Sequence, residues 1–122
     1  MSATTVRFKN STSIGIWFAV ARIEVTCRNA CPAGSPNAGF ATLGWFRLLP
    51  GGERNITNPT GNRFIGHYAE RDDGALYNGP FALEVHPVDA FFKCECFPVG
   101  PPFVRAGFRQ RDLDDSSTID YH

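Results

Sequence analysis

The segment Gly44-Trp-Phe-Arg-Leu-Leu-Pro-Gly-Gly-Glu53 joins aromatic strand residues to a sharp turn. The aromatic and aliphatic residues before the proline suit a pleated, half-buried surface. Pro50 presets φ for a turn, and Gly51 or Gly52 accepts the positive φ that a tight reversal needs. We therefore predict that a strand ends at Leu49 and that residues 53–56 return beside it as the second arm of a hairpin.

Two strand patterns precede this segment. Apolar and basic residues alternate over Val6–Lys9, as a half-buried strand requires. From Ile14 to Ile23 apolar residues occupy both faces, and the β-branched and aromatic content favours a strand over a helix. A strand that is apolar on both faces should lie at the centre of a sheet.

Further strand patterns follow, separated by turn formers about every ten residues. They cover residues 63–69, 81–85, 90–97, 104–113 and 117–121. No segment keeps helical spacing over three turns. The sequence thus predicts an all-β fold, a single antiparallel β-sandwich or small barrel of about seven to nine strands.

Length and charge restrict the function further. A chain of 122 residues with 43% apolar content has room for one packed domain, residues 1–122, for which we expect a flexible polar arm at residues 1–5. The twelve basic and twelve acidic residues cancel, which disfavours general nucleic-acid binding. The longest apolar run, Ile14–Ala21, is shorter than the roughly 18 to 20 residues of a transmembrane helix, and we recognise no secretory signal.

Four cysteines occur in two pairs, Cys27 with Cys31 and Cys94 with Cys96. The first pair opens a predicted long loop, residues 27–43, which is dense in turn formers. Same-face neighbours on a strand lie about 6.5 to 7 Å apart, at the limit for a disulfide, so each pair should bond to the other. Three disulfide connectivities, a four-thiolate zinc site, bonds between subunits and free buried thiols stay open. Disulfides would indicate an oxidising location, extracellular or at the cell surface.

Five segments, taken in order and spacing, carry a resemblance that covers nearly the whole chain. They are Val6–Thr12, Gly44–Gly52, Tyr68–Gly74, Asn78–Phe81 and Ala106–Asp112. Together they resemble the bacterial domain of unknown function numbered 1036. The resemblance implies a small, predominantly β, cysteine-containing domain with no assigned enzymatic activity.

The chain departs from that family at three positions. Lys9, Glu53 and Ala82 stand where such proteins tend to carry cysteine, and the long loop after Cys27 looks like an insertion. The disulfides of the family therefore cannot be transferred to this chain, apart from a bond that uses Cys94 or Cys96.

Motifs of known catalytic sites do not occur in the sequence. It contains no Gly-x-Ser-x-Gly elbow, no phosphate-binding loop and no His-Glu-x-x-His pair. The histidines, His67, His86 and His122, stand apart from any such motif. We therefore expect no enzymatic activity and no cofactor.

Two residue sets suggest binding instead. An aromatic set could stack on a sugar ring, although such residues often form the core of a small β domain: Trp17, Trp45, Tyr68 and Tyr77. An acidic set could supply oxygen ligands to calcium if its two turns meet, or could simply be solvated: Asp72, Asp73, Asp112, Asp114, Asp115 and Asp120.

The sequence therefore predicts a non-enzymatic structural or surface module that acts by contact. A near-neutral surface and polar ends that could pair with a neighbouring sheet edge favour self-association into homo-oligomers or filaments. The alternative is a module that binds carbohydrate or lipid head groups, with or without calcium.

Overall fold

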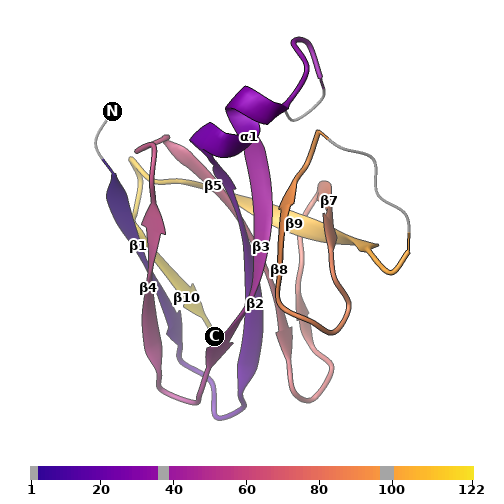
Figure 1. Ribbon diagram of the computed structural model, residues 1–122. Helices are drawn as coiled ribbons and strands as arrows, with labels where there is room; N and C mark the ends of the chain where they lie inside the picture. The colour runs from indigo at the N-terminus through magenta and orange to yellow at the C-terminus, as the bar shows by residue number, and fades with distance from the viewer. Residues whose placement is uncertain (1–2, 36–38, 97–100) are drawn as a thin grey trace.

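The computed structural model describes residues 3–35, 39–96 and 101–122, which are built mainly of β-strands (Figure 1). The elements are β1 (Thr4–Asn10), β2 (Ile16–Ile23), α1 (Val25–Ala30), β3 (Phe40–Leu48), β4 (Glu53–Asn58), β5 (Phe64–Arg71), β6 (Leu76–Tyr77), β7 (Phe81–Val85), β8 (Phe91–Cys94), β9 (Val104–Asp112) and β10 (Thr118–Tyr121). The predicted all-β class is confirmed. No helix in the described ranges is both long and apolar enough to cross a bilayer.

The strands form two sheets. One has the order β10-β1-β4, and the other follows the path β7-β9-β5-β2-β3-β8, with β6 added beside β5. In Figure 1 the smaller sheet lies at the left and β7 to β9 lie at the right. Neighbouring strands are antiparallel except β1 and β10, which are parallel. The described residues hold ten strands, one more than expected. The additional strand is the two-residue β6, within residues 75–77, where the sequence predicts at most a very short pairing.

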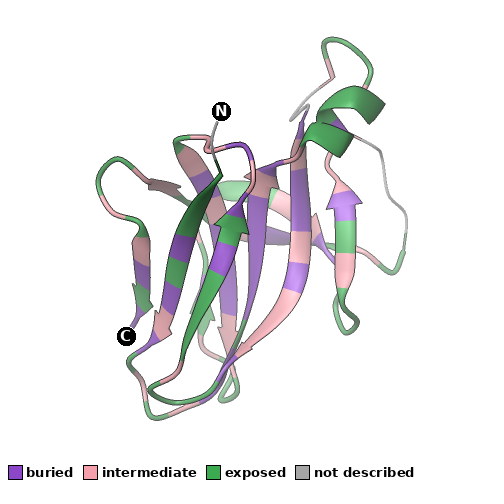
Figure 2. Ribbon diagram, turned by 60° about the vertical axis from the view of Figure 1, so that its left-hand side comes forward, coloured by how far each residue is buried: buried purple, intermediate pink, exposed green. Residues whose placement is uncertain are grey.

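Strand β2 is central, as predicted from its two apolar faces. It lies between β3 and β5, and its side chains alternate between two hydrophobic clusters. Most of its residues are therefore buried, as the burial colours of Figure 2 indicate. Ile16, Phe18 and Val20 enter the main core between the two sheets, where the rings of Phe8 and Phe18 stack with their centroids 4.3 Å apart. The main core consists of Val6, Phe8, Ile16, Phe18, Val20, Leu48, Ile56, Ile65, Ala69, Tyr77, Ile119 and Tyr121.

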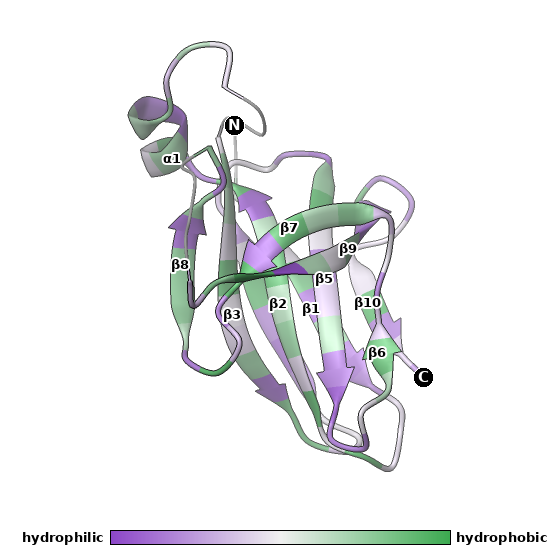
Figure 3. Ribbon diagram, turned by 90° about the vertical axis from the view of Figure 1, so that its right-hand side faces the viewer, coloured by the Kyte–Doolittle hydropathy of each residue, from purple (hydrophilic) through white to green (hydrophobic). Residues whose placement is uncertain are grey.

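The second cluster covers the other face of β2 because the large sheet curls. Figure 3 shows β7 and β9 passing in front of β5 and β2. This cluster, the second core, contains Ala19, Ala21, Tyr68, Val85, Ala106 and Phe108. Side chains then connect the edge strand β7 to β3, since the Thr42 hydroxyl lies 2.8 Å from the Glu84 carbonyl oxygen. The buried ammonium group of Lys93 lies 3.7 Å from the Glu84 carboxylate and 3.6 Å from that of Glu95.

The predicted turn after Leu49 is present. Gly51 has a φ of +73°, and the N–H of Gly52 donates to the Leu49 carbonyl oxygen at 2.8 Å. These features are those of a turn with proline at its second position and glycine at its third. An alanine at position 51 would be strained by its Cβ at that φ.

The predicted hairpin is wrong. Strand β4 does not return beside β3 but pairs with β1, from Lys9 opposite Glu53 to Thr4 opposite Asn58. The cause is non-local: Asn10 exchanges backbone hydrogen bonds with Gly51 and Gly52 at 2.8 and 3.0 Å. The turn therefore carries the chain from one sheet to the other, and Ile56 then faces the main core.

Three predicted boundaries also differ. Thr4 and Thr5, expected in the flexible arm, are already paired in β1, while Met1 and Ser2 lie outside the described residues. The predicted loop of residues 27–43 starts inside α1 and ends inside β3, with residues 36–38 not described. The strand predicted over 90–97 covers only Phe91–Cys94, and Phe97 is not described.

The four cysteines form two disulfides, as predicted between the pairs. Cys27 bonds to Cys94 and Cys31 to Cys96, with Cα–Cα distances of 5.3 and 5.8 Å. The zinc, free-thiol and intersubunit alternatives are therefore wrong. The bonds tie α1 and the chain after it to β8, and they are compatible with an oxidising environment.

Candidate functional site

Trp17 and Trp45 line one open groove on the surface of the large sheet. Trp17 comes from β2 and Trp45 from β3, and the groove is completed by Glu70 of β5 and the segment Pro87–Ala90 between β7 and β8. Its volume is about 560 Å³, and Trp17 is 43% exposed. An aromatic ring beside a carboxylate is thus open to solvent.

Strand register places charged groups on both sides of Trp17. Arg47 of β3 and Glu70 of β5 are its direct neighbours, and cross-strand neighbours share a face. The Arg47 Cζ lies 5.0 Å from the centre of the Trp17 ring. The guanidinium also donates two hydrogen bonds to Asp72, at 2.7 and 2.6 Å. Gly15 leaves the space for this pair, since a Cβ there would collide with both side chains.

The ion pair between Arg47 and Asp72 fixes the charge state of that side of the groove. The hydrogen bond between the two side chains lowers the pKa of Asp72 and raises that of Arg47. Both groups therefore stay charged over a wide pH range. Because the pair is half-exposed, its contribution to folding stability is small.

Trp45 is held rigidly. Its Nε1–H donates to the His86 carbonyl oxygen at 2.8 Å, and its ring packs against Tyr68 and Phe91 with centroid distances of 6.0 and 5.9 Å. The His86 Nδ1 in turn accepts the N–H groups of Val88 and Asp89, at 3.2 and 2.8 Å. His86 therefore orders the segment that forms the far wall of the groove.

Tyr68 supports the groove from below. Its side chain is buried, and its hydroxyl donates to the Glu70 carboxylate at 2.7 Å. Burial, and then the hydrogen bond to Glu70, raise the pKa of Tyr68 above its usual value. Tyr68 therefore stays a donor and orients one oxygen of Glu70, which leaves the other available in the groove.

Tyr77 lies away from the other three aromatic residues. Strand β6 pairs Tyr77 with Ala69, which faces the main core, so Tyr77 faces the main core as well. Its ring lies 4.8 Å from that of Tyr121. Of the four aromatic residues proposed from the sequence, the fold brings together Trp17, Trp45 and Tyr68.

The predicted acidic set does not converge. Asp72 and Asp73 follow the end of β5, whereas Asp112 pairs with Phe64 at its start, and eight residues of strand separate them by roughly 26 Å. Arginines neutralise several members, with Arg71 bound to Asp73 and Arg63 to Asp112 and Asp114. Within residues 3–35, 39–96 and 101–122, no three His, Cys, Asp or Glu side chains are grouped to hold a metal ion. The calcium site considered from the sequence is therefore not formed.

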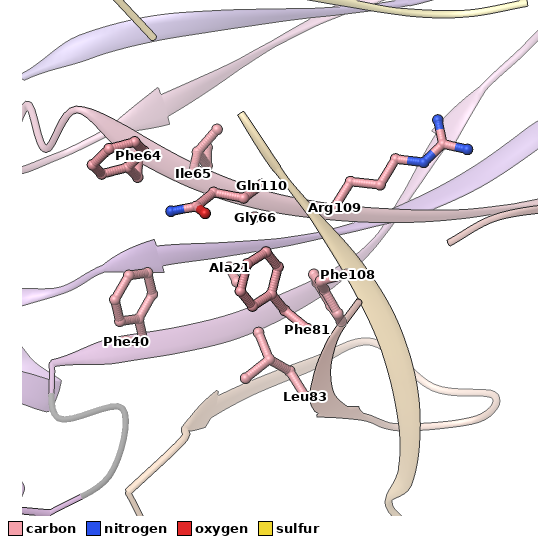
Figure 4. Close-up of a pocket in the computed structure, with 10 residues that line it drawn as sticks. All are labelled: Ala21, Phe40, Phe64, Ile65, Gly66, Phe81, Leu83, Phe108, Arg109 and Gln110. Carbon is pink, nitrogen blue, oxygen red and sulfur yellow. The ribbon is translucent and has the colours of Figure 1, made fainter. Parts of the chain in front are cut away.

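A second pocket, shown in Figure 4, is apolar. Phe81 and Leu83 of β7 lie opposite Phe64 of β5 (Figure 4), and the volume of the pocket is about 220 Å³. This is below the roughly 300 Å³ at which small-molecule sites begin. We therefore regard it as an unfilled part of the second core.

The three histidines do not form a common site. His67 is buried, and its Nδ1 lies 2.8 Å from the Tyr121 hydroxyl. Burial, and then the charges of Arg109 and Arg111, lower the pKa of His67 to about 3. His86 orders the groove wall, and His122 is exposed at the end of the chain.

No protein family, curated protein or solved structure matches this chain. The sequence did not indicate Arg47, Glu70 or His86 as functional, because their positions beside Trp17 and Trp45 depend on the register of strands far apart in the chain.

Proposed function

We propose that this protein is a binding module for carbohydrate, that it acts by contact instead of catalysis, and that the groove at Trp17 and Trp45 is its binding site. The observation that carries the proposal is the half-exposed Trp17 ring between Arg47 and Glu70 in an open groove. The resemblance to the bacterial domain of unknown function stays a prediction, and it too implies no assigned enzymatic activity.

The chemistry of the groove suits a sugar. A pyranose ring has an apolar C–H face that can lie against an indole, while its hydroxyl groups need donors and acceptors at the edge of that contact. Glu70 supplies an acceptor, and the pair of Arg47 and Asp72 supplies donors and an acceptor beside the same ring. Because hydrogen bonds hold Trp45 and the segment Pro87–Ala90 in place before binding, these residues should lose little conformational entropy when a ligand binds.

Fluorescence tests this proposal directly. The chain has only two tryptophans and both line the groove, so a ligand there should change the intrinsic emission. We expect hits on a glycan array that persist with a chelator, and a titration of such a glycan that saturates. Trp17→Ala should weaken binding by about tenfold or more, because ring contacts at a binding site are worth on the order of 1–2 kcal/mol.

Phe92→Ala is the matched control, because Phe92 is 51% exposed on β8 and does not line the groove. It should leave binding unchanged. Arrays with no hits, or equal binding by the Trp17→Ala protein, would refute the proposal. Vesicles of anionic lipid are the second arm, and binding there without glycan binding would assign the groove to lipid head groups.

Self-association is the second candidate function. Strands β4 and β8 are edge strands, and an edge can accept a strand from a second copy. The described part of the predicted arm cannot serve as that strand, because Thr4 and Thr5 already pair with β4. Light scattering after size exclusion tests this candidate, and a strict monomer at high concentration would exclude it.

A further inference from the structure

A polar pocket of about 290 Å³ lies on the main-core side of the large sheet, between β9 and β10. His67 of β5 lies at its buried end, opposite Arg109 of β9, and Arg111 follows on the same face. The smaller sheet ends at β10, so among the described strands none covers this part of β9. The pocket therefore opens beside two arginines.

The imidazole of His67 presents a donor to this pocket. Its Nδ1 contacts the hydroxyl of Tyr121, which is buried and has no other acceptor in the described part of the chain. The hydroxyl therefore donates to Nδ1. Because the ring is neutral, its proton is on Nε2, which has no partner among the described side chains and backbone groups.

Two arginines, Arg109 and Arg111, line the pocket beside His67. Arg109 is exposed; its Nε–H donates to the Asn78 carbonyl oxygen at 2.9 Å, and its Cζ lies 5.7 Å from the centre of the Tyr77 ring. Arg111 makes no ion pair within the described ranges. Burial, and then the charges of both arginines, lower the pKa of His67.

Three aspartates, Asp112, Asp115 and Asp120, also line the pocket, and two of them have partners outside it. Asp112 accepts hydrogen bonds from Arg63, the shortest at 2.6 Å, and Asp120 accepts one from the Ser11 hydroxyl at 2.6 Å. Asp115 is exposed on the turn before β10. Among the described residues no carboxylate is ion-paired to Arg109 or Arg111, although Asp115 and Asp120 line the same pocket.

We propose that this pocket binds a small oxyanion, a phosphate, sulfate or carboxylate group, between the Nε2–H of His67 and the guanidinium groups of Arg109 and Arg111. Guanidinium groups bind such anions through paired, charge-assisted hydrogen bonds, and the histidine adds a neutral donor from the floor. This site is separate from the tryptophan groove and does not depend on the function proposed for that groove.

Nuclear magnetic resonance of the ¹⁵N-labelled protein tests the site, with inorganic phosphate, sulfate and acetate as probes at constant ionic strength. We expect a saturable shift of the His67 ring nitrogens. Arg111→Gln should weaken binding by about tenfold, as the loss of a charge-assisted hydrogen bond does. Tighter binding of acetate than of phosphate and sulfate would identify a carboxylate site, and tighter binding of phosphate or sulfate than of acetate would identify a site for those anions.

Arg105→Gln is the matched control, since it removes the same charge from the same strand outside the pocket. It should bind the anion as the unchanged protein does. Equal weakening in both variants, or shifts that spread over all arginines without saturating, would overturn the proposal. A His67 ring that does not respond to any of the three anions would also overturn it. Tryptophan emission should not change with these anions, which separates this test from that of the groove.

Discussion

Removing one disulfide should cost less stability than removing an isolated cross-link of the same span, because the remaining disulfide still closes the long loop between α1 and β8. Cys27–Cys94 and Cys31–Cys96 join residues 67 and 65 positions apart. Taken alone, either bond should stabilise the folded state by about 4 kcal/mol through the entropy lost by the unfolded chain.

With one bond intact, the other closes only a small ring. Residues 27–31 and 94–96 form that ring, a loop of about eight residues worth about 2.5 kcal/mol. Cys31→Ala with Cys96→Ala should therefore lower the free energy of unfolding by about 2.5 kcal/mol, and removal of both bonds by about 7 kcal/mol. Since a small domain is stable by about 5–15 kcal/mol, the protein without cysteines should be marginal or unfolded.

Urea unfolding, followed by tryptophan emission, measures these differences. The two single removals should also differ, because Cys27 is fully buried whereas Cys31 is not. Loss of the Cys27 sulfur should add about 1 kcal/mol in lost packing. A cost of about 4 kcal/mol for each single removal, with strict additivity when both disulfides are removed, would refute the inference that one disulfide already closes the long loop for the other.

Three further predictions concern the core, the turn and the buried histidine. Phe8→Ala should lower the free energy of unfolding by about 3–5 kcal/mol, whereas Phe92→Ala should change it by less than about 0.5 kcal/mol; equal effects in urea unfolding would contradict the assigned core. Gly51→Ala should cost about 1 kcal/mol, because φ is +73° there, and an unchanged midpoint would contradict that turn. His67 stays neutral in the folded protein down to about pH 3, whereas in the unfolded chain it is protonated below about pH 6.5. Its contribution to the free energy of unfolding is therefore full above about pH 6.5. Below that pH the contribution falls by up to about 1.4 kcal/mol per pH unit, because only the unfolded state takes up the proton. His67→Gln should flatten the stability profile between about pH 6.5 and 4.5, above the range of the carboxylates, and an unchanged slope would exclude a buried neutral histidine.

The fold class and most strands could be predicted because they depend on local alternation. The two apolar faces of residues 14–23 required a central strand, and the Pro50-Gly51 pair required a turn. Turn chemistry specifies that the chain reverses, but not which strand it joins afterwards. The pairing of the chain after the turn depends on Asn10, forty residues before Pro50, because the backbone of Asn10 forms hydrogen bonds with both Gly51 and Gly52.

The groove could be predicted only in part for the same reason. An aromatic set is visible in the sequence, but Trp17 meets Glu70 only through the register of β2 against β5. Tyr77 was assigned to that set although its pairing with Ala69 turns it toward the main core. Local sequence shows which residue types are present, whereas strand register decides which of them share a face.

One face of β2 shows how the fold makes room for a site. Strand β9 pairs with β5 only over Phe64–His67. The curled part of the sheet therefore covers the part of β2 that pairs with Gly66, and it does not cover the part of β2 that pairs with β5 after Tyr68. Where that cover lies close, β2 carries the small residues Ala19 and Ala21, both fully buried. Two residues earlier on the same face stands Trp17, half-exposed. The small side chains of Ala19 and Ala21 permit the close packing of the second core. The large Trp17 ring stands where the covering strands no longer lie over β2. The curl of the sheet that builds the second core therefore also determines where the groove begins.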